Sequence, residues 1–233
     1  MSAATLHALA PPPADAVWPQ GCALALARDA ALFGEGDPAR NWYRLLSGSV
    51  RVFRVLRDGR RHISEFVFPG QIFGFEQGAQ HVQSAEAIEP AGVVAYSVER
   101  IEQRVAQDPA AQQAVRQLLM DRLAAAQERV MTLGGLNASG RLAAFLLEMA
   151  QRGAGPGQGR ARVAALPMNR HDLADYLGLT VETVSRLFTA LRRRGAIRLP
   201  SANRVEILDP EALEHAACGT VSGGSEAVLR RCA

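Results

Sequence analysis

Glu182, Ser185 and Arg186 are three polar residues at helical spacing in the segment GLTVETVSRLFTALRRRGAI, residues 178–197. Residues three and four apart are neighbours on a helix, so these side chains would share one face. An arginine can donate two parallel hydrogen bonds to guanine O6 and N7, a carboxylate can accept one from cytosine N4, and serine can contact several bases. The same spacing also allows an exposed Glu182–Arg186 ion pair with no binding role.

The other face of this predicted helix is apolar. Four residues follow the i, i+3, i+4, i+7 spacing of a helix packed on a core: Val184, Leu187, Phe188 and Leu191. The segment therefore predicts an amphipathic helix whose polar face is left for a partner.

A shorter helix is predicted immediately before it. Asn169 can cap the N-terminus of this helix with Asp172 three residues on, Gly178 suits its C-terminal end, and Thr180 can cap the next helix. Two helices joined by a short glycine-containing turn are typical of a helix-turn-helix, whose second helix enters the DNA major groove. The segment IRLPSANRVEIL, residues 197–208, then predicts two short strands that form a wing.

Further polar residues of this region are candidates for contacts with DNA phosphates, which bind basic and hydroxyl side chains and helix N-termini. Arg198 belongs to this group, while the run Arg192–Arg194 is either a phosphate contact or an ordinary solvated run. The backbone contacts are predicted at Arg170, His171, Thr180, Thr183, Thr189, Ser201, Asn203 and Arg204.

The charge distribution favours a polyanionic partner only for the C-terminal part. Residues 137–233 carry 13 arginines against 9 acidic residues, whereas residues 1–136 carry 13 against 14. All 26 basic residues are arginine. An excess of four charges also occurs on ordinary surfaces, so this signal is modest.

Several classes of protein are disfavoured by what the sequence lacks. It contains no run of 18 apolar residues and no secretory signal, so we expect no membrane partner and a cytoplasmic location. Cys22, Cys218 and Cys232 lack metal-ligand spacing, and we expect no metal. No phosphate loop, H-E-x-x-H, G-x-S-x-G or dinucleotide fingerprint is present, and we expect no enzyme activity.

The N-terminal half has the texture of an antiparallel barrel or roll. Short runs rich in β-branched and aromatic residues recur between about residues 25 and 98, and Asp58-Gly59 separates two of them as a hairpin signal. A long helix without glycine or proline follows, and five of its residues have the 4-3-4-3 spacing of a coiled-coil seam. The predicted dimer interface is Leu119, Leu123, Ala126, Val130 and Leu133, the alternative being that this stripe packs on its own barrel.

These elements predict an α+β chain divided along its length. The expected parts are a flexible N-terminal segment 1–24, a β-roll sensor-like domain 25–107, a dimerisation helix 108–136, a winged helix-turn-helix domain 137–216 and a flexible tail 217–233.

The order of β-roll, long helix and winged helix-turn-helix resembles the Crp/Fnr superfamily of bacterial transcription regulators over about residues 25–215. The segment LPMNRHDLADYLGLTVETVSRLFTALRRRGAIRLPSANRVEI is similar to FixK/FnrN-type members, and its E-x-x-S-R element is the most specific part. The resemblance implies a homodimer that binds double-stranded DNA at half-sites of the type TTGA…TCAA. Arg186 and Glu182 would address the G·C pair and Ser185 an adjacent thymine, in an activator that works with RNA polymerase.

The same resemblance bears on cofactors of the sensor half. Oxygen-sensing members hold an iron–sulfur centre with about four thiolates, but only Cys22 is available in the first half of this chain. Members that bind cyclic AMP place an arginine before Ser-Ala, where this chain has Gln83 before Ser84-Ala85, and a neutral amide cannot replace a bidentate charged contact.

We therefore expect no cofactor, and a relay in an oxygen-limitation or nitrogen-fixation and respiration cascade. The alternative is a sensor whose DNA binding depends on a small molecule or on haem bound in the β-roll, where His62 and His81 are the histidines available. Specific DNA binding without any added effector would favour the relay.

Overall fold

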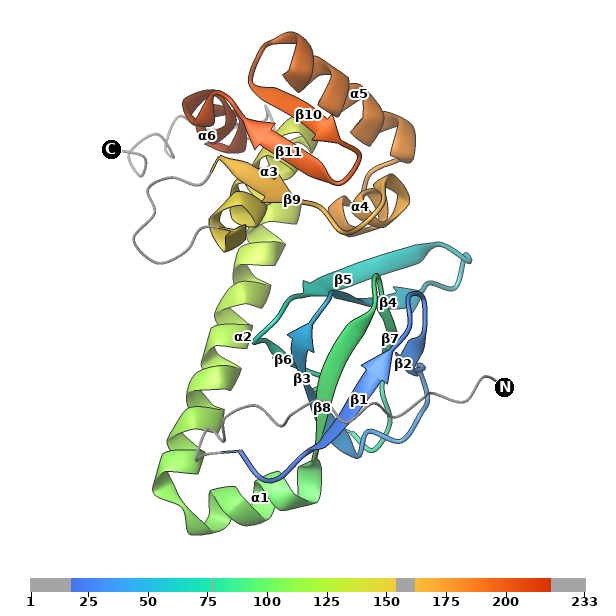
Figure 1. The fold of residues 1–233 in the computed structure, drawn as a ribbon, viewed down its shortest axis with the longest axis vertical. Helices are drawn as coiled ribbons and strands as arrows, with labels where there is room; N and C mark the ends of the chain where they lie inside the picture. The colour runs from blue at the N-terminus through green and yellow to red at the C-terminus, as the bar shows by residue number, and fades with distance from the viewer. Residues whose placement is uncertain (1–17, 77, 154–161, 219–233) are drawn as a thin grey trace. The chain divides into compact units, whose positions relative to one another are not determined.

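The computed structural model describes residues 18–76, 78–153 and 162–218 and has the α+β architecture predicted from the sequence (Figure 1). Its contacts group the chain into two compact units. The first comprises residues 1–125 and 167–178, and the second comprises residues 126–166 and 179–233.

The first unit contains two four-stranded antiparallel sheets, which confirm the predicted β-roll. One sheet has the order β1-β8-β3-β6, with β1 Cys22–Leu26, β8 Ala91–Ser97, β3 Asn41–Ser47 and β6 Ile72–Phe73. The other has the order β2-β7-β4-β5, with β2 Ala31–Phe33, β7 Ser84–Ala87, β4 Val50–Val55 and β5 Arg61–Val67. The predicted hairpin at Asp58-Gly59 joins β4 to β5, and Gly59 has the positive φ of 83° that this turn requires.

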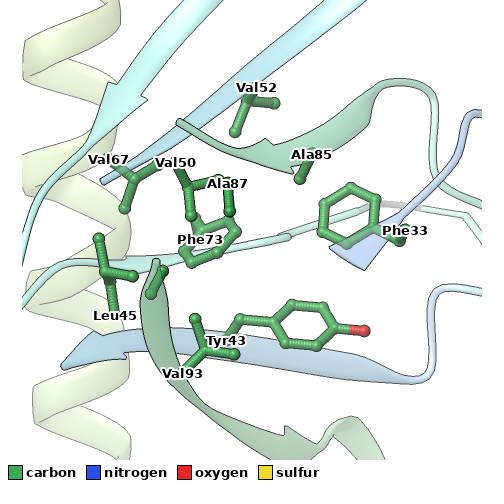
Figure 2. Packing of buried hydrophobic residues seen from close by; sticks show 11 residues of the cluster. Phe33, Tyr43, Leu45, Val50, Val52, Val67, Phe73, Ala85, Ala87 and Val93 are labelled. Atoms are coloured by element: carbon green, nitrogen blue, oxygen red, sulfur yellow. The ribbon is translucent and has the colours of Figure 1, made fainter. Parts of the chain in front are cut away.

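The core of this unit is a cluster of buried apolar side chains that both sheets supply. Phe33, Tyr43, Leu45, Val50, Val52, Val67, Phe73, Ala85, Ala87, Ala91 and Val93 form the cluster, and Figure 2 shows it between the strands. Successive side chains of a strand point to opposite faces, so Val50 and Val52 face this core while Arg51 points away from it.

The expected flexible segment 1–24 is wrong at its C-terminal end, because β1 begins at Cys22 and pairs with β8. Trp18 packs beside Trp42 and Tyr96, with ring centroids 6.5 and 5.7 Å apart. Burial of an aromatic ring and a strand pairing fix this stretch, although the alanine- and proline-rich sequence before it suggested disorder.

Two helices follow β8. Helix α1, Val98–Gln107, ends at Asp108, and α2, Pro109–Gly135, is the long helix that the sequence predicts. Proline is well tolerated at a helix start, so Pro109 separates the two elements.

The second unit contains α3 Ala138–Gly153, β9 Val163–Ala165, α5 Val181–Arg193, β10 Ile197–Ser201, β11 Arg204–Ile207 and α6 Pro210–Cys218. Asn137 caps α3, because the Gly140 N–H donates to its Oδ1 at 2.9 Å. Strands β10 and β11 form the predicted wing hairpin, and β9 joins them in a three-stranded antiparallel sheet (Figure 1).

The core of the second unit is built largely on α3. Four apolar residues at helical spacing on this helix are all buried: Leu142, Phe145, Leu146 and Met149. Helix α6 continues to Cys218, two residues into the tail expected to be flexible, because Leu213 anchors it by complete burial. The rest of that tail and residues 154–161 after α3 lie outside the described residues.

Candidate DNA-binding surface

The first helix of the predicted motif is α4, Arg170–Leu177, and both of its predicted ends are confirmed. The Asp172 N–H donates to the Asn169 side chain at 2.9 Å, which satisfies an otherwise unpaired donor of the first turn. Gly178 ends the helix in the left-handed region with φ 64°, a conformation that glycine adopts without steric cost.

Helix α4 is held to the second sheet of the first unit by a cluster of ion pairs. Asp172 is only 1% exposed and pairs with Arg61 and with Arg51 Nη1 at 3.4 Å, while Asp175 pairs with Arg61 Nε at 2.9 Å. Arg51 also binds Glu86 at 2.8 Å and Asp29 at 3.2 Å. We call Asp29, Arg51, Arg61, Glu86, Asp172 and Asp175 the α4 ion cluster.

Charge in this cluster is stabilised despite burial. Burial disfavours the charged form of Arg51, but hydrogen bonding to Glu86 and the neighbouring charge of Asp172 outweigh that effect and raise its pKa. Sequence reasoning missed this role of Asp172, because an acidic residue in a first helical turn is fully explained by the helix dipole.

The second helix of the motif is α5. Thr180 caps it as predicted, accepting a hydrogen bond from the Thr183 N–H at 3.2 Å. Val184, Phe188 and Leu191 are buried, and Leu187 is half-buried. The predicted amphipathic character of this helix is confirmed.

The polar face of α5 is open to solvent. Glu182, Ser185 and Arg186 are all exposed.

This face also carries an open groove of about 550 Å³. The groove is lined by Ser185, Arg186, Thr189, Ala190, Arg193 and Arg194. The residues that line it include three arginines and no acidic residue, a composition that favours a polyanionic partner.

The residues of α4 and α5 that are predicted to contact the DNA backbone differ in the hydrogen-bond donors that they have available. The Thr180 and Thr183 hydroxyls lie 3.0 Å apart and share one hydrogen bond, so one hydroxyl hydrogen remains for a phosphate. The Thr189 hydroxyl donates to the Ser185 carbonyl at 3.0 Å and would have to exchange that bond. His171 is exposed and Arg170 half-buried, and burial lowers the pKa of Arg170.

The wing places its three candidates, Ser201, Asn203 and Arg204, in exposed positions. The Ser201 hydroxyl donates to the Asn203 amide oxygen at 2.8 Å, which leaves the Asn203 NH₂ group directed to other acceptors. Arg198 differs, because its Nε donates to Glu206 across the hairpin at 2.8 Å. Its guanidinium is therefore already paired.

Comparison with known proteins identifies the family. Residues 140–216 match the Crp-like helix-turn-helix domain, and residues 24–108 match the cyclic nucleotide-binding domain. The nitrogen fixation regulation protein FixK of Rhizobium meliloti is 38% identical over 182 residues, 78% of this chain and 81% of the relative. FixK of Azorhizobium caulinodans is 38% identical over 201 residues, 86% of this chain and 81% of the relative. The chain is a FixK-like member of the Crp/Fnr family.

A solved structure agrees with this assignment. FixK2 from Bradyrhizobium japonicum superimposes with a TM-score of 0.79 at 33% identity and covers 87% of this chain and 100% of its own. As a Crp/Fnr-type protein the chain is a DNA-binding transcription regulator, and the helix-turn-helix match includes α4, α5 and the wing.

Helix α2 of this FixK-like regulator carries an apolar face that the rest of the described chain leaves uncovered. Leu119, Leu123 and Val130 are 44%, 51% and 68% exposed, Ala126 is exposed and Leu133 is half-buried. Met120 and Met131, at 55% and 68% exposure, widen the face beyond the predicted stripe. Leu119 and Leu123 belong to the same unit as the barrel, and their exposure disfavours the alternative that this part of the stripe packs on it.

The sensor half of the regulator offers no evident metal site in the described residues, where no group of three or more His, Cys, Asp or Glu side chains gathers. His81 is buried, lies 3.2 Å from the Glu76 carboxylate through Nδ1, and stacks on Phe33 with centroids 3.7 Å apart. The Ser84 hydroxyl beside Gln83 accepts a hydrogen bond from the Glu35 N–H. No helix in the described ranges has the length and apolar character needed to span a bilayer.

Proposed function

We propose that this regulator binds as a homodimer to a palindrome of the type TTGA…TCAA, with one α5 in each of two successive major grooves. The observation that carries the proposal is the joint exposure of Glu182, Ser185 and Arg186 on one face of a capped helix. Arg186 and Glu182 address a G·C pair and Ser185 an adjacent thymine.

Backbone contacts fix the orientation of that helix. On α4 and α5 these are Arg170, His171, Thr180, Thr183 and Thr189, and on the wing they are Ser201, Asn203 and Arg204. Hydroxyl, amide and guanidinium groups of this kind position a protein on DNA without reading its sequence.

The biological setting follows from the relatives. Two of them are nitrogen fixation regulation proteins, and we infer an activator that works with RNA polymerase in an oxygen-limitation or nitrogen-fixation and respiration cascade. The regulator acts as a relay without an iron–sulfur centre, because Cys22 is the one cysteine in the first half of the sequence.

Arg186→Ala is expected to weaken binding to the palindrome by about 1–3 kcal/mol and to relax the preference at the contacted guanine, because a bidentate base contact is lost. The measurement is fluorescence anisotropy on the palindromic duplex and on duplexes carrying each other base at that position. Arg204→Ala is the matched control, since a phosphate contact on the wing should weaken all duplexes equally. An equal loss on every duplex for Arg186→Ala would assign Arg186 to the backbone.

Purified chain with no added effector is expected to bind the palindrome in preference to a scrambled duplex of the same length. This outcome distinguishes the relay from a sensor that needs a ligand in the β-roll. Specific binding that is detectable only after adding a small molecule or haem would exclude the relay.

A further inference from the structure

The C-terminal end of α5 carries three successive arginines, Arg192–Arg194, and the fold separates them. Arg193 and Arg194 line the groove on the polar face, together with Ser185 and Arg186. Arg192 is exposed, as Arg193 and Arg194 are, but it does not line that groove. A charge run whose members look alike in the sequence is thus divided into residues that line the groove and one that does not.

Helical geometry explains the place of Arg193. Arg193 follows Arg186 by seven residues, almost two turns, and therefore projects from nearly the same side. The buried residues Val184, Phe188 and Leu191 mark the opposite side of the helix. Arg192 follows Ser185 by the same interval and lies toward the edge of the polar face, where the groove lining does not include it.

Electrostatics makes the end of this groove a site for an anion. Three arginines line it, Arg186, Arg193 and Arg194. Within the described part of the chain, no hydrogen bond or ion pair engages the guanidinium of Arg193 or Arg194. Basic side chains at a helix C-terminus also interact favourably with the helix dipole. That effect would apply equally to Arg192, so it does not explain why Arg193 and Arg194 line the same groove as Arg186.

The distance between the two ends of the groove indicates which part of DNA meets each end. Seven residues at 1.5 Å each place Arg193 about 10 Å along the axis from Arg186. A side chain at that distance lies beyond the base edges that Arg186 can contact, and the nearest anions there are the phosphates that border the major groove.

We propose that Arg193, with Arg194 beside it, forms a binding site for a backbone phosphate of duplex DNA at the C-terminal end of α5. The site rests on the proposed function, because it presumes that the α5 polar face enters the major groove. It adds a sequence-independent contact to the helix that reads bases. This contact holds the C-terminal end of that helix to DNA, at the opposite end from Thr180.

The test compares Arg193→Gln with Arg192→Gln in the full chain. Each variant is titrated by anisotropy on the palindromic duplex and on a scrambled duplex, from about 50 to 200 mM salt. Each phosphate contact contributes about 0.9 to the slope of log K against log salt, so Arg193→Gln in a dimer should reduce that slope by about 1.8. It should leave the ratio of the two affinities unchanged. Arg192→Gln should reduce the slope by less than half as much.

Arg193→Lys provides the charge-preserving variant, because a lysine binds phosphate as a point charge. It should retain the wild-type slope. Equal slope losses for the Arg192 and Arg193 glutamine variants would overturn the proposal, as would a changed affinity ratio or a slope lost in Arg193→Lys. If the wild type does not discriminate between the duplexes, the proposed base reading fails, while the slope comparison still decides the phosphate site.

Discussion

Arg51→Leu is expected to lower the free energy of unfolding by about 1.5–3 kcal/mol, because it removes the charged hydrogen bonds to Glu86 and Asp172 while Arg61 still pairs with Asp172. The Arg51 guanidinium binds Glu86, Asp29 and the almost completely buried Asp172. Urea denaturation followed by tryptophan fluorescence measures the change. Both tryptophans of the chain, Trp18 and Trp42, lie in the unit that contains Arg51.

Arg54→Leu is the matched control on the same strand. Arg54 pairs with Glu35 at 3.0 Å, but their side chains are 54% and 40% exposed, and such pairs contribute at most about 1 kcal/mol. Equal losses for the two variants would show that the α4 ion cluster adds nothing beyond a surface pair.

The pH dependence of this difference follows from the pKa of Arg51. Burial opposes its charge, yet Glu86 and Asp172 raise its pKa. A group whose pKa is raised by folding contributes fully below its ordinary value and loses that contribution only as the pH rises through the folded value. For an arginine this window lies at strongly alkaline pH, so the difference between Arg51→Leu and the wild type should be constant around neutrality.

The DNA-binding surface could be predicted from local sequence signals because each of its elements is determined locally. The caps at Asn169 and Thr180 and the turn at Gly178 depend on residues at most four positions away. The apolar stripe of α5 needs only helical periodicity to predict which side is buried. The exposure of Glu182, Ser185 and Arg186 follows from that stripe.

The features that sequence reasoning missed depend on residues far apart in the chain. Arg51 and Asp172 are 121 positions apart, and nothing in the local pattern around either residue points to the other. Trp18 follows a stretch rich in alanine and proline, and its packing on Tyr96 depends on strand pairing. The division of Arg192–Arg194 needed the groove itself, because all three arginines share the same charge and exposure.

Helix α2 shows how the two kinds of information combine. The 4-3-4-3 spacing predicted which side of the helix is apolar. The structure shows that Leu119, Leu123 and Val130 on that side are exposed in the single chain. Exposed Met120 and Met131 lie next to this stripe, which makes the apolar face broad enough for a partner helix. An apolar face of this extent is costly to leave in water, and we propose that a second copy covers it.

Leu123→Glu is expected to abolish the dimer, since it places a carboxylate from each copy in the centre of that apolar face. Analytical ultracentrifugation should show the mass fall from twice the 25.0 kDa of the chain to a single copy. The affinity for the palindrome should fall by about 10²–10⁴-fold, because two half-sites are no longer bound by one linked pair of helices.

Ala125→Glu is the control for this prediction, because Ala125 is exposed on α2 and lies about 200° around the helix from Leu123. It introduces the same charge and should leave both mass and affinity unchanged. A Leu123→Glu chain that still sediments as a dimer would show that the copies associate through another surface. Loss of the dimer without loss of affinity would instead show that one copy of α5 suffices for binding, and would remove the palindrome from the proposed function.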